Sequence, residues 1–209
     1  MKKIYFFILL VNFSMQSQEW KVSEKSVTGV FSVEKSKTDL FALINKWISI
    51  NYNSAQNVIQ MNDAESGTII IKGINEVNYS NLTGKLLAPS YSADVISSKF
   101  NHTIEINVKD NKFRVIYTIT GVSNDPNGAI FSALFYDCVN LTGENTAAIS
   151  AYNEETEKYL KQGLIGKQKR EKYKQAVIDM FSELNKNLLE NIKLTMLSID
   201  NSTKTEDKW

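Results

Sequence analysis

The stretch HTIEINVKDNKFRVIYTIT, residues 102–120, decides the fold. Apolar and polar residues alternate over residues 104–109 and alternate again over residues 112–119. A period of two is typical of strands that bury one face. Asp110 and Asn111 lie between the two runs and are residues that favour a tight turn. The stretch therefore predicts a β-hairpin.

The same alternation fixes the register of the hairpin. With a two-residue turn, all the pairs in which both residues are apolar lie on one face. The apolar pairs are Val108 with Phe113, Ile106 with Val115 and Ile104 with Tyr117, and the other face pairs Asn107 with Arg114, Glu105 with Ile116 and Thr103 with Thr118. A slip by one residue would set apolar against polar side chains, so the register is well specified. One face of the sheet is buried, and the other is mostly polar.

Segments before the hairpin predict three more strands. Residues 27–33 form the first, and residues 58–62 and 68–73 form a second hairpin. The turn of that hairpin ends at Gly67, which adopts a positive φ more readily than other residues. The sheet is therefore antiparallel.

Helices are predicted on either side of these strands. Ser36 and Asp39 have the spacing of a helix cap, and they precede apolar residues at helical spacing, namely Leu40, Leu43, Ile44, Trp47 and Ile48. Near the carboxyl end, a second stripe consists of Val177, Phe181, Leu184, Leu188, Ile192, Thr195 and Ile199. It predicts an amphipathic helix from about residue 169 to 198, roughly 45 Å long. A helix over residues 145–164 would complete a helical hairpin.

Residues 1–17 are arranged like a secretory signal. Two lysines precede an apolar run over residues 4–11, and small and polar residues follow it. We expect cleavage after Ser17, with Ser14 as the alternative. The run is shorter than the about 20 residues that a transmembrane helix needs, and no later segment is apolar for that length. The sequence thus predicts an exported protein, periplasmic or secreted, without a transmembrane anchor.

The composition excludes several classes of protein. The chain has 209 residues, of which 24 are Lys or Arg and 23 are Asp or Glu, so no strong field favours nucleic acid or an anionic membrane. Cys138 is the only cysteine, which excludes an intramolecular disulfide and the small disulfide-rich scaffolds. One histidine and one cysteine do not supply the usual zinc ligand sets. We expect no metal or other cofactor and no nucleic-acid partner.

These segments predict an α+β fold in which helices pack on one face of a curved antiparallel sheet. We expect a signal peptide over residues 1–17, a sheet with one packed helix over residues 18–143, a helical region over residues 144–200, and a frayed tail over residues 201–209. The long amphipathic helix and its hairpin partner would cover the apolar face of the sheet.

Two of these stretches resemble a known family. SGTIIIKG (residues 66–73) and HTIEINVKDNKFR (residues 102–114), with the helix over residues 39–47, look like a secreted bacterial domain of unknown function that has a TBP-like fold. The resemblance covers residues 27–122 and implies a helix-grip arrangement without any activity or catalytic residues. TBP itself grips DNA with a basic sheet, whereas the polar face here sets Glu105 against its lysines and arginine, which argues against nucleic acid.

No motif assembles into a reaction. The chain lacks a calcium loop, a glycine-rich phosphate loop and a Gly-x-Ser-x-Gly elbow. His102 and Cys138 would be a base and a nucleophile only if they met. The alternation places His102 on the buried face at the rim of the core, and we interpret Cys138 as a small buried apolar residue. Converging carboxylates stay open, because a sequence does not show which acids lie together.

Two segments and the free face of the sheet are the candidate binding surface. Residues 74–99 form a long excursion that carries aromatic residues. The second segment is residues 123–140, within which residues 129–136 are a core or edge strand in our interpretation, with a core-filling loop or an exposed apolar lip as alternatives. The candidate residues are Tyr79, Leu86, Leu87 and Tyr91, then Glu105, Asn107 and Arg114 on the sheet, and Ile130, Phe131 and Phe135.

The sequence favours a non-enzymatic binding or interaction module of the bacterial cell envelope, whose partner would be an unknown protein or envelope component. Two alternatives remain. An envelope hydrolase would need converging carboxylates in a cleft. A carrier of an apolar small molecule between sheet and helix would need an apolar cavity of roughly 300 Å³ or more.

Overall fold

The hairpin expected over residues 102–120 lies at the centre of the structure. In the computed structural model, strand β5 (Val95–Lys109) pairs with strand β6 (Lys112–Val122), and the predicted apolar pairs face each other. Asn111 closes the turn with a φ of 62°, a conformation that asparagine tolerates better than most residues. The register inferred from the sequence is confirmed.

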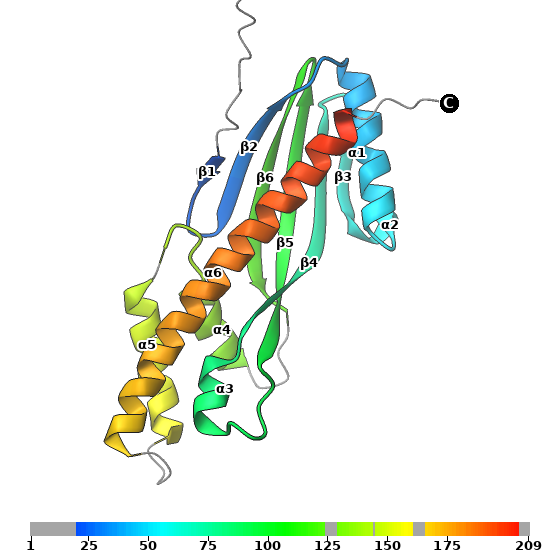
Figure 1. Ribbon diagram of the computed structural model, residues 1–209. Coiled ribbons are helices and arrows are strands. Elements are labelled where there is room, and N and C mark those ends of the chain that lie inside the picture. Colours follow the sequence, from blue (N-terminus) through cyan, green and yellow to red (C-terminus); the bar gives the residue numbers. More distant parts are fainter. Residues whose placement is uncertain (1–19, 124–128, 144, 161–165, 205–209) are drawn as a thin grey trace, which may run out of the picture.

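Six antiparallel strands form one sheet in the order β1-β2-β6-β5-β4-β3 (Figure 1). The other four strands are β1 (Trp20–Val22), β2 (Ser26–Ser32), β3 (Ile59–Asp63) and β4 (Thr68–Ser80). The structure describes residues 20–123, 129–143, 145–160 and 166–204; for residues 129–131 and 159–160 it describes the backbone alone. The signal peptide expected over residues 1–17 lies outside these ranges and stays a prediction.

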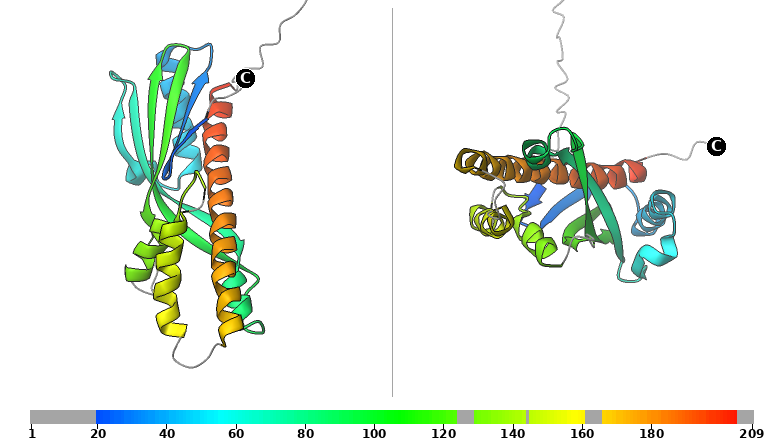
Figure 2. Two further views of the ribbon diagram at one scale, coloured as in Figure 1. Left: turned by 90° about the vertical axis from the view of Figure 1, so that its left-hand side faces the viewer. Right: turned by 90° about the horizontal axis from the view of Figure 1, so that it is seen from below.

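Helices cover one face of the sheet, as the TBP-like arrangement implies. They are α1 (Lys37–Asn51), α2 (Ala55–Val58), α3 (Leu82–Leu87), α4 (Ala129–Cys138), α5 (Thr146–Leu160) and α6 (Lys167–Lys204). The long helix α6 crosses the sheet diagonally and extends beyond it, where α3, α4 and α5 gather around its first half (Figures 1 and 2). Val108, Val115 and Leu184 are at most 1% exposed. The α+β fold class is therefore as predicted.

Helix α1 begins at the cap that the sequence indicates. The hydroxyl of Ser36 accepts a hydrogen bond from the backbone N–H of Asp39 at 3.1 Å and donates one to its carboxylate at 2.7 Å. Such a cap satisfies amide groups that have no partner within the helix. Leu40, Ile44 and Ile48 are fully buried, so the predicted stripe does face the core.

Helix α6 ends later than the predicted position near residue 198. Residues 201–204 continue the helix instead of fraying, because Thr203 is fully buried four residues after Ile199 and Lys204 pairs with Asp200 at 2.5 Å. Residues 205–209 lie outside the described part of the chain. The buried positions of α6 are Tyr173, Val177, Met180, Phe181, Leu184, Asn185, Leu188, Ile192, Met196, Ile199, Asp200 and Thr203. Met196, rather than the expected Thr195, occupies the buried stripe.

The excursion expected over residues 74–99 is mostly sheet. Strands β4 and β5 stay paired out to Ser80 opposite Val95, and α3 fills the short connection between them. The sequence hides these arms because Gly73 and Asn75 hold inward-facing positions where the alternation would place apolar residues. The segment over residues 18–143 accordingly contains four helices, α1 to α4, rather than one.

Residues 129–136 form part of a helix, so the interpretation as a core or edge strand is wrong. Helix α4 contacts β6, where the hydroxyl of Tyr136 donates to the carbonyl of Ile119 at 2.9 Å. The ammonium of Lys25 donates to two carbonyl oxygens at the end of this helix, where positive charge is favoured. A short, continuous apolar run does not distinguish helix from strand by its period.

The helical hairpin is confirmed. Helices α5 and α6 lie side by side in both figures, and Lys174 of α6 pairs with Glu157 of α5 at 3.0 Å. The described end of α5, at residue 160, falls short of the predicted residue 164, and residues 161–165 lie outside the described ranges. The pair extends the core beyond the sheet through Tyr152, which contacts the ring of Phe181 edge-on.

Candidate functional site

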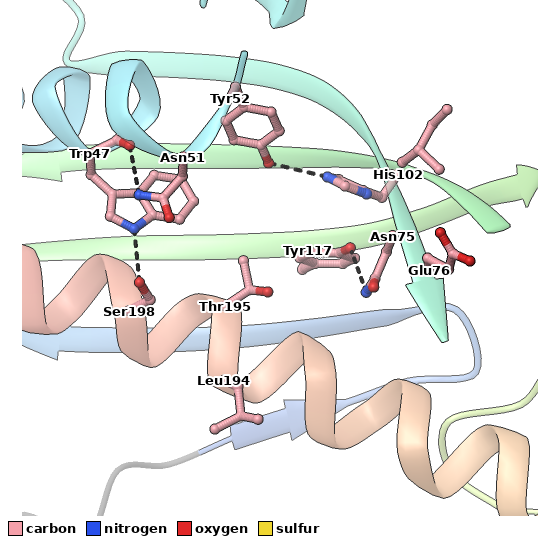
Figure 3. A pocket seen from close by; sticks show the side chains of 11 residues that line it. Trp47, Asn51, Tyr52, Asn75, Glu76, His102, Tyr117, Leu194, Thr195 and Ser198 are labelled. Carbon is pink, nitrogen blue, oxygen red and sulfur yellow. Dashed lines mark hydrogen bonds between the residues drawn. The ribbon is translucent and has the colours of Figure 1, made fainter. Parts of the chain in front are cut away.

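A pocket of about 390 Å³ opens on the covered face of the sheet, between the end of α1 and the last third of α6 (Figure 3). We call it the α1–α6 pocket. It is lined by Trp47, Asn51 and Tyr52 at the end of α1, by Ile74, Asn75 and Glu76 of β4, by His102 of β5 and Tyr117 of β6, and by Leu194, Thr195 and Ser198 of α6.

The floor of this pocket is a stacked pair of rings. The centroids of His102 and Tyr117 lie 4.7 Å apart, with 28° between the ring planes, and the two residues are 5% and 1% exposed. The pairing of β5 with β6 shifts register beside this pair: Asn101 lies opposite Gly121 and His102 opposite Ile119, so Thr120 of β6 is left without a partner. Irregularities of this kind occur often beside functional sites.

Gly73 makes room for the histidine. It lies opposite His102 in the pairing of β4 with β5. A Cβ atom at position 73 would lie 2.8 Å from Nε2 of His102, a distance that real Cβ atoms essentially never show. It would lie 3.0 Å from Cε1 of Tyr52, which is tighter than nine in ten real Cβ contacts. The absence of a side chain at this one position therefore allows both rings to lie over β4.

Hydrogen bonds in the floor leave two polar groups unused. Nε2 of His102 and the hydroxyl of Tyr52 lie 3.4 Å apart, and Nδ2 of Asn75 donates to the hydroxyl of Tyr117 at 3.2 Å. Nδ1 of His102 is buried and has no hydrogen-bond partner among the described residues. The hydroxyl of Tyr117 accepts from Asn75, so its own proton remains to be donated.

Burial keeps the floor uncharged. It lowers the pKa of His102 to about 4, so the imidazole is neutral at neutral pH. Burial also raises the pKa of Tyr52 to about 12 and the pKa of Tyr117 above its usual range, so both hydroxyls keep their protons. Glu76 is the only Asp, Glu, Lys or Arg of the lining, and it is exposed beside Lys99, 3.8 Å away.

The two helices that form the walls are held together beside the pocket. The indole N–H of Trp47 donates to the hydroxyl of Ser198 at 3.0 Å, and the indole meets the ring of Tyr52 edge-on. Figure 3 shows this bridge from α1 to α6 next to the open space. The bridge fixes the distance between the walls, which is what a preformed binding site requires.

The structure does not provide a centre for metal or thiol chemistry in its described part. No group of three or more His, Cys, Asp or Glu side chains that could hold a metal occurs among the described residues. Cys138 is fully buried, and burial raises the pKa of its thiol to about 12. It is therefore a small buried residue, as the sequence analysis interprets it, rather than an activated nucleophile.

The candidate residues named from the sequence lie in three separate places. Tyr79 and Phe135 meet in a second cavity of about 340 Å³, which we call the distal pocket; its other lining residues are Thr83, Ile96, Ser97, Ser98, Val122, Ser132, Tyr152 and Met180. Leu86 and Leu87 pack partly buried against the core, whereas Tyr91 is 94% exposed. The side chains of Ile130 and Phe131 are outside the described part.

The remaining three candidates lie on the outer face of the sheet. The guanidinium of Arg114 donates twice to the side-chain oxygen of Asn107, at 3.1 and 2.7 Å. Glu105, two residues before Asn107 in β5, lies on the same face opposite Ile116. Sequence reasoning missed the α1–α6 pocket itself. The one available signal was that His102 and Tyr117 share the buried face with apolar residues.

The family model of a domain of unknown function, DUF4468, with a TBP-like fold, matches residues 28–123. Residues 28–123 are therefore similar to the DUF4468 domain. They include the α1 wall and the whole floor of the α1–α6 pocket, whereas the α6 wall lies outside the matched residues. The match confirms the resemblance over residues 27–122.

Two solved structures are similar to the chain. A DUF4468 family protein from Bacteroides ovatus has a TM-score of 0.50 at 12% identity, over 89% of this chain and 90% of that one. A TBP-like protein from Parabacteroides distasonis has a TM-score of 0.44 at 14% identity, over 85% and 91%. At such identity, the first structure shows the fold alone and nothing about activity. No curated protein matches the chain.

One further finding concerns membranes. Within the described ranges, none of the helices has the length and apolar character that a membrane span would need.

Proposed function

We propose that the protein is a non-enzymatic ligand-binding module of the bacterial cell envelope, and that the α1–α6 pocket is its binding site. The observation that carries this proposal is the buried, unpartnered Nδ1 of His102 in the floor of a preformed pocket. A buried polar group without a partner lowers stability, so its retention is expected where a ligand supplies the partner.

The composition of the pocket favours binding over hydrolysis. A hydrolase of the kind weighed from the sequence would use two carboxylates that flank the bond to be cut. The lining of the α1–α6 pocket includes one carboxylate, Glu76, which accepts from the hydroxyl of Ser97 at 2.7 Å and points to the rim. The buried floor instead offers neutral groups that recognise a ligand by hydrogen bonds.

The binding experiment compares two tryptophan substitutions on α6. Thr195 lines the pocket, so Thr195→Trp would fill it, whereas Asn201 is exposed on the same helix and Asn201→Trp is the matched control. The purified protein is incubated with a small-molecule extract of the bacterium's envelope, washed, and analysed by native mass spectrometry. We expect a discrete compound on the wild type and on Asn201→Trp, and its loss from Thr195→Trp. Equal retention by all three, or retention by none, would refute the proposal.

Export is part of the proposal and rests on residues 1–17. The order of lysines, apolar run and polar residues supports it, and the similar DUF4468 family protein comes from the bacterium Bacteroides ovatus. Amino-terminal sequencing of the natural protein is the direct test. We expect the chain to begin at Gln18 in the envelope or culture fraction. An intact Met1 in the cytosolic fraction would contradict export and leave the pocket proposal standing.

The distal pocket supports a second candidate, a carrier of an apolar small molecule. Its lining includes Phe135, Tyr152 and Met180, and the ring of Phe135 packs against that of Phe181 at 5.0 Å. The neutral, apolar dye N-phenyl-1-naphthylamine is a suitable probe. Fluorescence enhancement that Thr83→Trp abolishes and Thr195→Trp retains would favour this carrier over the leading proposal.

A further inference from the structure

The ligand class of the α1–α6 pocket follows from which hydrogen-bonding groups its floor leaves free. This inference rests on the proposed function, because it assumes that the pocket binds a ligand. The hydroxyl proton of Tyr52 has one described neighbour that can accept it, Nε2 of His102 at 3.4 Å. If that proton is donated there, the neutral imidazole carries its own proton on Nδ1.

The floor then contains two hydrogen-bond donors that have no described acceptor. One is Nδ1–H of His102, and the other is the hydroxyl of Tyr117, whose oxygen already accepts from Asn75. Both belong to one stacked pair of rings, so they are held in fixed positions relative to each other. Two adjacent donors are complementary to an acceptor oxygen such as that of a carbonyl group.

A negative charge on that oxygen would find no compensation in this site. The lining contains no lysine or arginine, and its one carboxylate, Glu76, lies at the rim. His102 would be the sole residue able to become positive, and its pKa of about 4 makes protonation at pH 7 about a thousand-fold unfavourable. A buried anion without a partner loses its hydration and gains little.

We propose that the α1–α6 pocket binds an uncharged molecule, with a neutral carbonyl oxygen on His102 and Tyr117. The pocket thereby discriminates against the carboxylate of the same shape. His102 and Tyr117 determine this specificity.

The test uses pairs of molecules that differ in charge and hardly in shape. The probes are cyclohexanecarboxamide and cyclohexanecarboxylate, and hexanamide and hexanoate, titrated at pH 7 against the full mature chain. Binding is followed by the NMR shifts of His102 and Thr195, with Asn201 as a remote reference. We expect each amide to shift the first two residues and to bind at least ten-fold more tightly than its carboxylate.

Variants separate recognition from folding. His102→Leu removes Nδ1 and keeps an apolar side chain of suitable size, so we expect it to fold and to bind the amides about ten-fold more weakly. Thr195→Trp should abolish the shifts for every probe. Carboxylates that bind in the pocket as well as the amides would overturn this inference, yet they would support the pocket as a binding site. Probes that shift no pocket residue would also overturn it, and the envelope-extract experiment would then decide the proposed function separately.

Discussion

The covered face of the sheet has two halves that differ in chemistry although the same two strands build them. In the apolar half, Ile104 and Ile106 of β5 face Tyr117 and Val115 of β6, and the aliphatic side chains are completely buried beneath the helices. The polar half begins two residues before Ile104 in β5. There, His102 carries an unpartnered nitrogen beside an open pocket.

This contrast separates stability from function within one surface. Aliphatic side chains that fill space gain free energy from burial without needing partners. The polar half gains less, because His102 must remain neutral and one of its nitrogens remains without a hydrogen bond. A sheet that served only as a scaffold would continue the aliphatic pattern, so the polar half is where selection for binding is expected.

The largest effect is expected in the apolar half. Ile106→Ala removes a fully buried side chain and leaves a cavity, so the free energy of unfolding should fall by about 3 kcal/mol. Guanidinium denaturation measures the change. Ile74→Ala is the control, because a side chain that is 58% exposed should cost less than about 0.5 kcal/mol. Equal losses in the two variants would contradict the division of the face.

Acid should weaken the polar half through His102. The unfolded chain takes up this proton near pH 6.5, whereas the folded pKa is about 4, so the unfolded state binds more protons between these values. Stability should therefore fall as the pH drops from 6.5 to 4, by about 3 kcal/mol in total from this group. Denaturation curves at several pH values, compared with His102→Gln, isolate the contribution. Parallel pH profiles for the two proteins would count against a buried neutral histidine.

Gly73→Ala tests how tightly the floor is built. A methyl group 2.8 Å from Nε2 of His102 forces the ring or the strand to move, and such overpacking should cost about 2 kcal/mol. Gly121→Ala is the matched control on the same sheet, since its nearest neighbour would lie 3.9 Å away. Thermal unfolding and the NMR shift of His102 report the two effects. If both glycines tolerate alanine equally, the histidine is not held against β4.

The smallest effect is expected from Tyr117→Phe. It removes the acceptor of the hydrogen bond from Asn75, and one such bond contributes about 1 kcal/mol. Tyr91→Phe makes the same chemical change at a residue that is 94% exposed and should leave stability unaltered. Urea denaturation of the two variants gives the difference. Amide affinity should also fall in Tyr117→Phe, and unchanged affinity would remove this hydroxyl from the ligand site.

Local sequence rules predicted the scaffold well. The register between β5 and β6 follows from alternation alone, because a slip would bury Arg114 and expose Val115. The cap at Ser36 predicted the start of α1 for a similarly local reason. The period of α6 predicted which side of it faces the sheet, although it gave no sign that Thr203 would be buried.

The candidate site was harder to predict because its parts are distant in the chain. His102 was placed correctly on the buried face, but its environment depends on Gly73 of β4 and Tyr52 after α1, which no local pattern connects to it. The helix α4 was missed for another reason, since its unbroken apolar run fits a strand as well as a helix.

The position of β2 in the sheet has a consequence for how the chain matures. Val27 of β2 pairs with Tyr117 of β6, so the first long strand to be synthesised forms its hydrogen bonds to β6 only after the last strand of the described sheet has been made. Contacts between such distant residues form slowly. We propose that the protein crosses a membrane unfolded, behind its signal peptide. Because β2 and β6 pair late, the amino-terminal segment stays unfolded and can pass through the translocation channel.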